Sequence, residues 1–109
     1  METISLIARG GCMQPIIKDG DRILVAKQKK FRTGDIIVYF NEHHKLIVHR
    51  YAKILGIEKT KGDNNIFFDA FVIKKPLGKV LVDEPFFKRI KMLFRLKTML
   101  LNELLRGTF

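Results

Sequence analysis

The sequence contains a small set of side chains that could act on a peptide bond. Cys12 is the single cysteine, and it lies in the segment RGGCMQP, where two glycines and a proline constrain the chain. Gly10 and Gly11 permit unusual backbone angles, so a turn here could expose the thiol and direct the Cys12 N–H at a bound carbonyl oxygen. A thiol attacks only when a base or a lowered pKa produces its thiolate. The alternative is that Cys12 is a small buried apolar residue.

Three histidines are candidates for that base. His43 and His44 lie in a polar segment with the composition of a hairpin tip, where solvated turn residues are expected. His49 lies inside the apolar segment LIVHRY, where it is either a satisfied sheet residue or a base. Zinc binding by Cys12 and the histidines is not indicated, because their spacing matches no usual ligand pattern. We therefore expect neither a metal nor a cofactor.

Two aspartates follow the histidines along the chain. Asp63 lies in the turn-forming segment KGDNN, and Asp69 comes six residues later. An aspartate in such a segment commonly caps nearby backbone N–H groups. It can also orient the imidazole of a cysteine–histidine pair. The residues alone leave both interpretations open.

Short strands separated by turns are expected to position these groups. Segments that are β-branched, aromatic or of alternating polarity predict strands at residues 3–8, 22–26, 35–40, 45–55 and 77–82. The third and fourth of these flank a polar turn and predict a hairpin. Residues 66–73 are also expected to be extended. Many short strands at close spacing favour a mainly β fold, a compact coiled antiparallel sheet, over βαβ units.

The sequence changes character at Pro85. Beyond it, apolar residues recur at helical spacing and predict an amphipathic helix that starts at Pro85 and stops at Gly107. Its predicted apolar face consists of Phe87, Ile90, Phe94, Leu101 and Leu104, flanked by Leu93, Leu100 and Leu105. The chain is thus divided into a β-domain at residues 1–84 and a basic C-terminal helix at residues 85–109.

Composition limits the class of protein. A length of 109 residues with 47% hydrophobic content suits one globular domain. No apolar run approaches the roughly 20 residues of a membrane-spanning helix, and the N-terminal residues lack the pattern of a secretory signal. A single cysteine forms no internal disulfide, so we expect a cytoplasmic protein. The net charge of +10 indicates an anionic partner such as nucleic acid, anionic lipid or an acidic protein.

The order of the segments resembles the type I signal peptidase superfamily, which includes the self-cleaving LexA-type repressors. That family has a Ser-Met-x-Pro nucleophile motif followed by Gly-Asp and an apolar strand, a Gly-Asp-Ile-Val block, a base block, an aspartate block and a closing Gly-Lys-Val strand. The matching segments here are CMQP at 12–15, GDRILV at 20–25, GDIIV at 34–38, VHRY at 48–51, KGDNN at 61–65 with Asp69 beyond, and GKV at 78–80. The histidine in VHRY is similar to the archaeal and endoplasmic-reticulum type, whereas most bacterial members have lysine there.

The resemblance implies a peptidase with Cys12 as nucleophile, His49 as general base and Asp69 as the group that orients His49. Asp63 takes the position of the second family aspartate, with a catalytic or supporting role. The oxyanion site and substrate groove would be formed by Gly10, Gly11, Cys12, Met13 and Pro15. The implied substrate is an extended leader or signal-like peptide with small residues near the cleaved bond.

Three departures from the family pattern leave rival functions open. The nucleophile position is cysteine instead of serine, and Gly10 stands where many members have a serine whose hydroxyl supports the oxyanion. The N-terminal transmembrane anchor of typical signal peptidases is not seen. The first rival is an inactive peptide-binding module of the same fold, and the second is a basic domain that binds a membrane surface.

The basic C-terminal segment has several possible partners. Residues 86–109 contain six basic residues and one acidic residue, a net charge of +5. The helix could cover the β-domain, lie on an anionic membrane surface, or dock on a partner protein through residues 86–106. Nucleic acid is not expected, because no helix-turn-helix segment precedes the peptidase-like region and the basic residues are not interleaved with stacking aromatics. The oligomeric state is left open.

Overall fold

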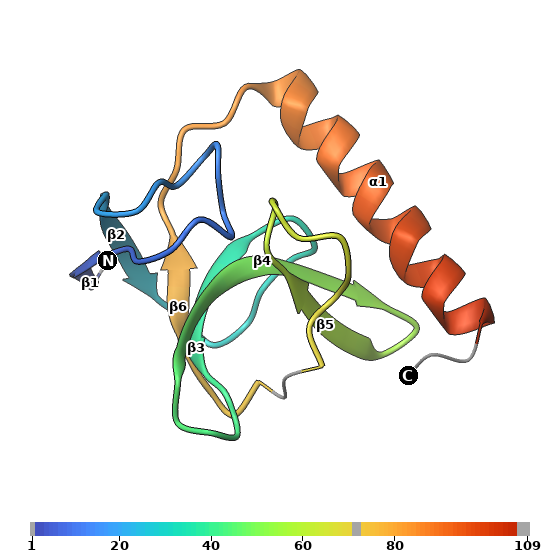
Figure 1. Cartoon of the computed structure of the whole chain (residues 1–109), viewed down its shortest axis with the longest axis horizontal. Helices are drawn as coiled ribbons and strands as arrows, with labels where there is room; N and C mark the ends of the chain where they lie inside the picture. Colours follow the sequence, from blue (N-terminus) through green and yellow to red (C-terminus); the bar gives the residue numbers. More distant parts are fainter. Residues whose placement is uncertain (1, 71–72, 107–109) are drawn as a thin grey trace.

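One six-stranded antiparallel sheet forms the body of the protein, and one helix packs against an end of it (Figure 1). The structure is a computed structural model that describes residues 2–70 and 73–106. Its elements are β1 Thr3–Ile7, β2 Arg22–Lys27, β3 Ile36–Phe40, β4 Leu46–Ile54, β5 Ile57–Lys61, β6 Lys75–Val80 and α1 Phe86–Leu105. The predicted mainly β fold with a C-terminal helix is confirmed.

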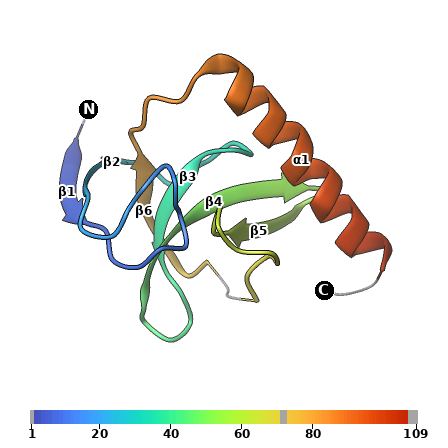
Figure 2. The same cartoon turned by 45° about the horizontal axis from the view of Figure 1, so that its top comes forward.

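The strand order places the last strand in the middle of the sheet. The order is β1-β2-β6-β3-β4-β5, so β6 lies between β2 and β3 and pairs with both of them. The sheet coils strongly, and β1 lies at the end opposite α1 (Figure 2). The predicted hairpin of β3 and β4 is confirmed, with Val38 opposite Val48. Asn41 closes its turn, because its Oδ1 accepts hydrogen bonds from the backbone N–H groups of His43 and Lys45.

The fifth strand differs from the prediction. β5 has the sequence IEKTK, which is mostly polar, and its extended form comes from pairing with β4 through a tight turn at Leu55 and Gly56. Residues 66–73 were expected to begin in an extended form; residues 66 and 67 form a bend, and residues 66–70 form no strand. Residues 71 and 72 lie outside the described residues.

The largest core cluster holds the segment around Cys12 against the sheet. Met13 and Ile17, both in the loop between β1 and β2, are almost completely buried. They pack with apolar side chains of several strands, namely Ile23, Val25, Ile36, Val38 and Val80. The loop that contains the cysteine is therefore anchored in the core on the C-terminal side of Cys12.

The helix packs on the sheet through residues outside the predicted apolar face, although one of them, Leu100, was predicted to flank that face. Met92, Leu96 and Leu100 pack with Ala52 and Ile54 of β4 and with Phe68, which lies in the segment between β5 and β6. The predicted apolar face points outward instead, and its members Phe87, Ile90, Phe94 and Leu101 are exposed. The predicted start at Pro85 is confirmed, and Gly107 lies outside the described residues. None of the helical residues that the structure describes forms a segment long and apolar enough to cross a membrane.

Candidate active site

The loop between β1 and β2 forms a tight turn around Cys12. Gly10 has a φ of 89°, a left-handed conformation that favours glycine, and its N–H donates a hydrogen bond of 2.8 Å to Asp19 Oδ1. The Gln14–Pro15 peptide bond is cis. Cys12 is half-buried at the tip of this turn.

A second loop, residues 62–65, holds the turn from the other side. The Asn64 N–H donates to the Cys12 carbonyl oxygen at 2.8 Å, and the Asn64 side chain donates to the Gly11 carbonyl oxygen at 3.2 Å. The chain approaches so closely that a Cβ on Gly62 would lie 2.7 Å from the Cys12 carbonyl oxygen. Glycine is therefore required at position 62, and the KGDNN segment fixes the backbone of Cys12.

The imidazole of His49 is held by a hydrogen-bonded chain of buried side chains. His49, on β4, donates from Nδ1 to Asp69 Oδ2, which leaves Nε2 as its other ring nitrogen. The same Asp69 oxygen accepts a hydrogen bond of 2.8 Å from the Thr60 hydroxyl. The Thr60 hydroxyl also contacts the Tyr39 hydroxyl at 2.6 Å. Burial raises the pKa of Tyr39 to about 12, so this phenol is neutral at physiological pH.

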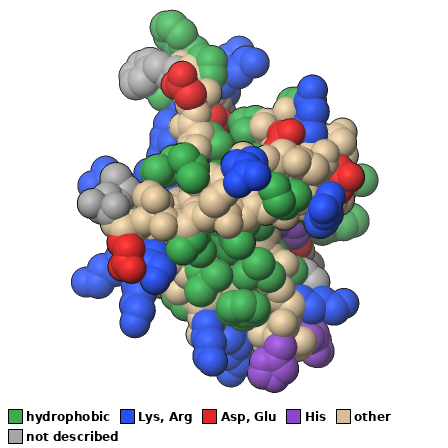
Figure 3. Space-filling view, turned by 90° about the vertical axis from the view of Figure 1, so that its left-hand side faces the viewer, with side chains coloured by type: hydrophobic (Ala, Val, Ile, Leu, Met, Phe, Trp, Pro, Cys, Tyr) green, Lys and Arg blue, Asp and Glu red, His purple; other side chains and the backbone are tan. Residues whose placement is uncertain are grey.

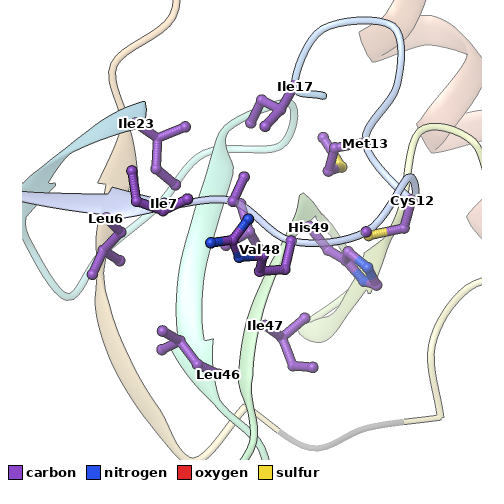
Figure 4. Close-up of a pocket in the computed structure, with 13 residues that line it drawn as sticks. Leu6, Ile7, Cys12, Met13, Ile17, Ile23, Leu46, Ile47, Val48 and His49 are labelled. Atoms are coloured by element: carbon purple, nitrogen blue, oxygen red, sulfur yellow. The ribbon is translucent and has the colours of Figure 1, made fainter. Parts of the chain in front are cut away.

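Cys12 and His49 line the same pocket, which has a volume of about 350 Å³. In the close-up view the Cys12 sulfur points toward the His49 ring (Figure 4). Apart from Arg9, Gly10 and these two residues, the lining is apolar and consists of Leu6, Ile7, Ala8, Met13, Ile17, Ile23, Leu46, Ile47 and Val48. Hydrophobic side chains also gather on the face of the molecule that carries β1 (Figure 3). Of the predicted groove residues, Gly10 and Met13 line the pocket, whereas Gly11 and Pro15 belong to the turn beside it.

Two strand edges border this pocket. β1 is one of the two edge strands of the sheet, and in the part of the chain that the structure describes it pairs with β2 alone. The pairing of β4 with β5 begins only at Arg50, so among the described residues Leu46 to His49 pair with β3 alone. Both borders therefore present backbone N–H and C=O groups that an extended peptide could pair with.

The thiol of Cys12 is not a preformed thiolate. Its pKa is raised above the ordinary value chiefly by burial, and further by the negative charges of Asp69 and Asp63. A hydrogen bond from its own backbone N–H lowers the pKa; this effect is smaller than that of burial but larger than that of either carboxylate. The thiol is therefore protonated at neutral pH and needs a base to become a nucleophile.

Asp63 does not line the pocket, and its carboxylate binds a different partner. Its carboxylate accepts two hydrogen bonds from the Arg50 guanidinium, at 3.1 and 2.6 Å. Glu84 accepts two more, at 2.6 and 3.3 Å, and the Gly34 carbonyl oxygen accepts another. Arg50 is only 1% exposed, so this network is buried. The structure brings together Cys12, His49 and Asp69 and places Asp63 in the support of the 62–65 loop.

Several residues of this arrangement were not predicted from the sequence. Thr60 and Tyr39 orient Asp69, and Glu84 is the second carboxylate that binds the Arg50 guanidinium. An arginine inside the apolar strand LIVHRY was a signal for a buried ion pair. Thr60 and Glu84 carried no such signal, because each lies in a polar segment.

A comparison with known families agrees with this architecture. The model of the family described as Peptidase S24-like matches residues 2–64. The chain belongs to the Peptidase S24-like family. The match includes the turn at Cys12, all of β4 and residues 62–64 of the second loop, and it ends before Asp69 and α1. No curated protein and no solved structure gave a match to the chain.

Proposed function

We propose that this Peptidase S24-like protein is a peptidase that cleaves an extended leader or signal-like peptide through Cys12. The observation that carries the proposal is how the His49 ring is held. One ring nitrogen is bound to the buried carboxylate of Asp69, and the ring shares a pocket with the Cys12 thiol. A histidine oriented in this way is the base that a protonated thiol requires. The proposal therefore takes His49 as the base, as the resemblance to the archaeal and endoplasmic-reticulum type implies.

Substrate binding would follow from the two strand edges. An extended peptide that lies between β1 and residues 46–49 would pair with backbone groups on its borders. Alternate side chains would enter the apolar pocket, since successive side chains of an extended chain point to opposite sides. The lining contains no carboxylate, and a pocket of about 350 Å³ suits small or medium apolar side chains.

The first half of the reaction would form a thioester. As the Cys12 sulfur bonds to the scissile carbonyl carbon, His49 Nε2 accepts the thiol proton and Asp69 stabilises the resulting imidazolium. The carbonyl oxygen becomes an oxyanion near the Cys12 N–H, which already faces the sulfur. The C–N bond then breaks as the imidazolium protonates the leaving amine.

The second half would release the enzyme. His49 Nε2 removes a proton from a water molecule as the hydroxide adds to the thioester carbonyl. The C–S bond then breaks, and the His49 imidazolium returns the proton to the Cys12 sulfur, which gives a carboxylic acid product, the free thiol and a neutral imidazole. The Gly10 N–H is bound to Asp19 and does not join the oxyanion site in this arrangement. Loss of one such donor costs roughly 100-fold in rate, so we expect a slow enzyme.

A peptide-library experiment tests the proposal. The protein is incubated with a proteome-derived peptide library, and new termini are identified by mass spectrometry. Cys12→Ala and His49→Ala should abolish cleavage, whereas His43→Ala, which removes an exposed histidine of the β3–β4 turn, should leave it unchanged. A defined set of cut sites lost with Cys12 and His49 supports the proposal. Peptides that are bound but never cut would indicate a binding module and overturn it.

A further inference from the structure

The outward side of α1 carries a continuous apolar stripe. Ile90, Phe94, Leu101 and Leu105 have exposed fractions of 47%, 77%, 39% and 78%. With about 3.6 residues per turn, their spacing places all four on one side of the helix, and the packed residues Leu96 and Leu100 lie on a different side. A helix that only covers the sheet would have polar residues on this side. The stripe is therefore not accounted for by the fold.

Cations lie along both borders of the stripe. By helical geometry, Lys97 lies on one side and Lys91 and Arg95 lie on the other, and all three residues are exposed. Residues 86–109 have a net charge of +5, from six basic residues and one acidic residue. Apolar residues bordered by lysine and arginine are typical of helices that lie in the interface of an anionic membrane.

The stripe cannot turn inward without cost. Leu96 and Leu100 are buried against β4, and Arg89 forms an ion pair of 3.2 Å with the buried carboxylate of Asp35. Just before the helix, Glu84 is held by Arg50. The helix is thus fixed at its start and along its length, and its apolar stripe is held facing outward.

We propose that this outer face of α1 docks the protein on an anionic membrane surface. Ile90, Phe94, Leu101 and Leu105 enter the boundary between headgroups and acyl chains, and the flanking cations contact anionic headgroups. Charge decides between this occupant and a second copy of the chain. Two copies that met through this face would bring their cationic borders together, whereas an anionic lipid surface neutralises them.

The membrane-facing stripe and the substrate pocket are separate. α1 packs at the end of the sheet formed by β4 and β5, while β1 and the first half of β4 border the pocket (Figures 1 and 2). Docking through the helix therefore leaves the pocket accessible, and membrane binding can be tested without peptidase activity.

Vesicle co-sedimentation tests the proposal. The full chain is mixed with vesicles of phosphatidylcholine alone or with added phosphatidylserine. We expect binding to the anionic vesicles, a loss of roughly 100-fold or more in Phe94→Glu/Leu101→Glu, and a loss of about fivefold for each cation replaced in Lys91→Gln/Lys97→Gln. The matched control is Leu24→Glu/Phe67→Glu, which removes the same two exposed side-chain types and changes the charge equally but lies outside α1. Thermal melting verifies that each variant folds.

Three results would overturn the proposal. The first is no binding to anionic vesicles, and the second is equal binding by the α1 variant and its control. The third is a dimer in sedimentation velocity without lipid that Phe94→Glu/Leu101→Glu dissociates, because the stripe would then be the interface between two copies.

Discussion

Replacing Arg50 by methionine should destabilise the protein far more than loss of an exposed arginine. Arg50 is 1% exposed, and its guanidinium makes four hydrogen bonds to two carboxylates and one to a backbone carbonyl. The side chains of Asp63 and Glu84 are themselves only 6% and 5% exposed. Methionine fills a similar volume but leaves both carboxylates buried without their cation.

The size of the effect follows from that burial. Removing one partner of a buried ion pair costs about 3 to 5 kcal/mol. At about 4 °C per kcal/mol for a domain of this size, the melting temperature should fall by about 12 to 20 °C. Differential scanning calorimetry measures this shift directly, and urea unfolding gives the free energy independently.

Two further variants make the prediction specific to the buried network. Arg22→Met is the control, because Arg22 is exposed and makes a hydrogen bond of 3.4 Å to Ser5, so its loss should cost less than about 0.5 kcal/mol. The triple variant Arg50→Met/Asp63→Asn/Glu84→Gln also removes the two carboxylate charges left without a cation, so it should be more stable than Arg50→Met. The reasoning is refuted if Arg50→Met costs less than about 1 kcal/mol, or if the triple variant is the least stable.

The remaining predictions concern the His49 side of the site. Thr60→Val should lower the free energy of unfolding by about 1 to 3 kcal/mol, because it leaves the buried Tyr39 hydroxyl without its hydrogen-bond partner. Adding Tyr39→Phe should recover part of that loss, as measured by urea unfolding. Asp69→Asn should lower peptide cleavage by up to about 10⁴-fold with little change in KM, and an equal loss in an exposed Asp83→Asn control would contradict this role. Iodoacetamide should modify Cys12 more slowly than free cysteine at pH 7, with a rate that still rises above about pH 9, because the thiol pKa is raised. Faster modification than free cysteine at pH 6 would show a thiolate–imidazolium pair instead.

Most of the sheet could be predicted from local sequence, and the exception is informative. The segments that form β2, β3, β4 and β6 are apolar or β-branched at most of their buried positions. The exceptions are His49 and Arg50 of β4, which are buried with hydrogen-bonded carboxylates. β5 is a polar segment at the edge of the sheet, and its strand form depends on its partner. A single-sequence pattern does not contain that pairing.

For the helix, local sequence predicted the element but not its orientation. Its period was correct, and so was its start, but the pattern could not tell which apolar side packs on the sheet. Large apolar residues occur on two sides of α1, with Leu96 and Leu100 buried and Phe94 and Leu105 exposed. Hydrophobic periodicity reports an apolar stripe and carries no information on what covers it.

The positions of the two aspartates could not be derived from spacing, because they depend on the alternation of one strand. His49 and Arg50 are neighbours on β4, and consecutive side chains of a strand point to opposite faces. His49 therefore reaches the pocket and Asp69, while Arg50 reaches Asp63. A shift of one residue in the pairing of β4 would exchange the two faces and place the arginine beside the thiol. The pairing of Val38 with Val48 in β3 and β4 thus determines whether His49 or Arg50 lies next to Cys12. Because these two residues are consecutive in β4, only one register of the strand places the histidine in the pocket and the arginine beside Asp63.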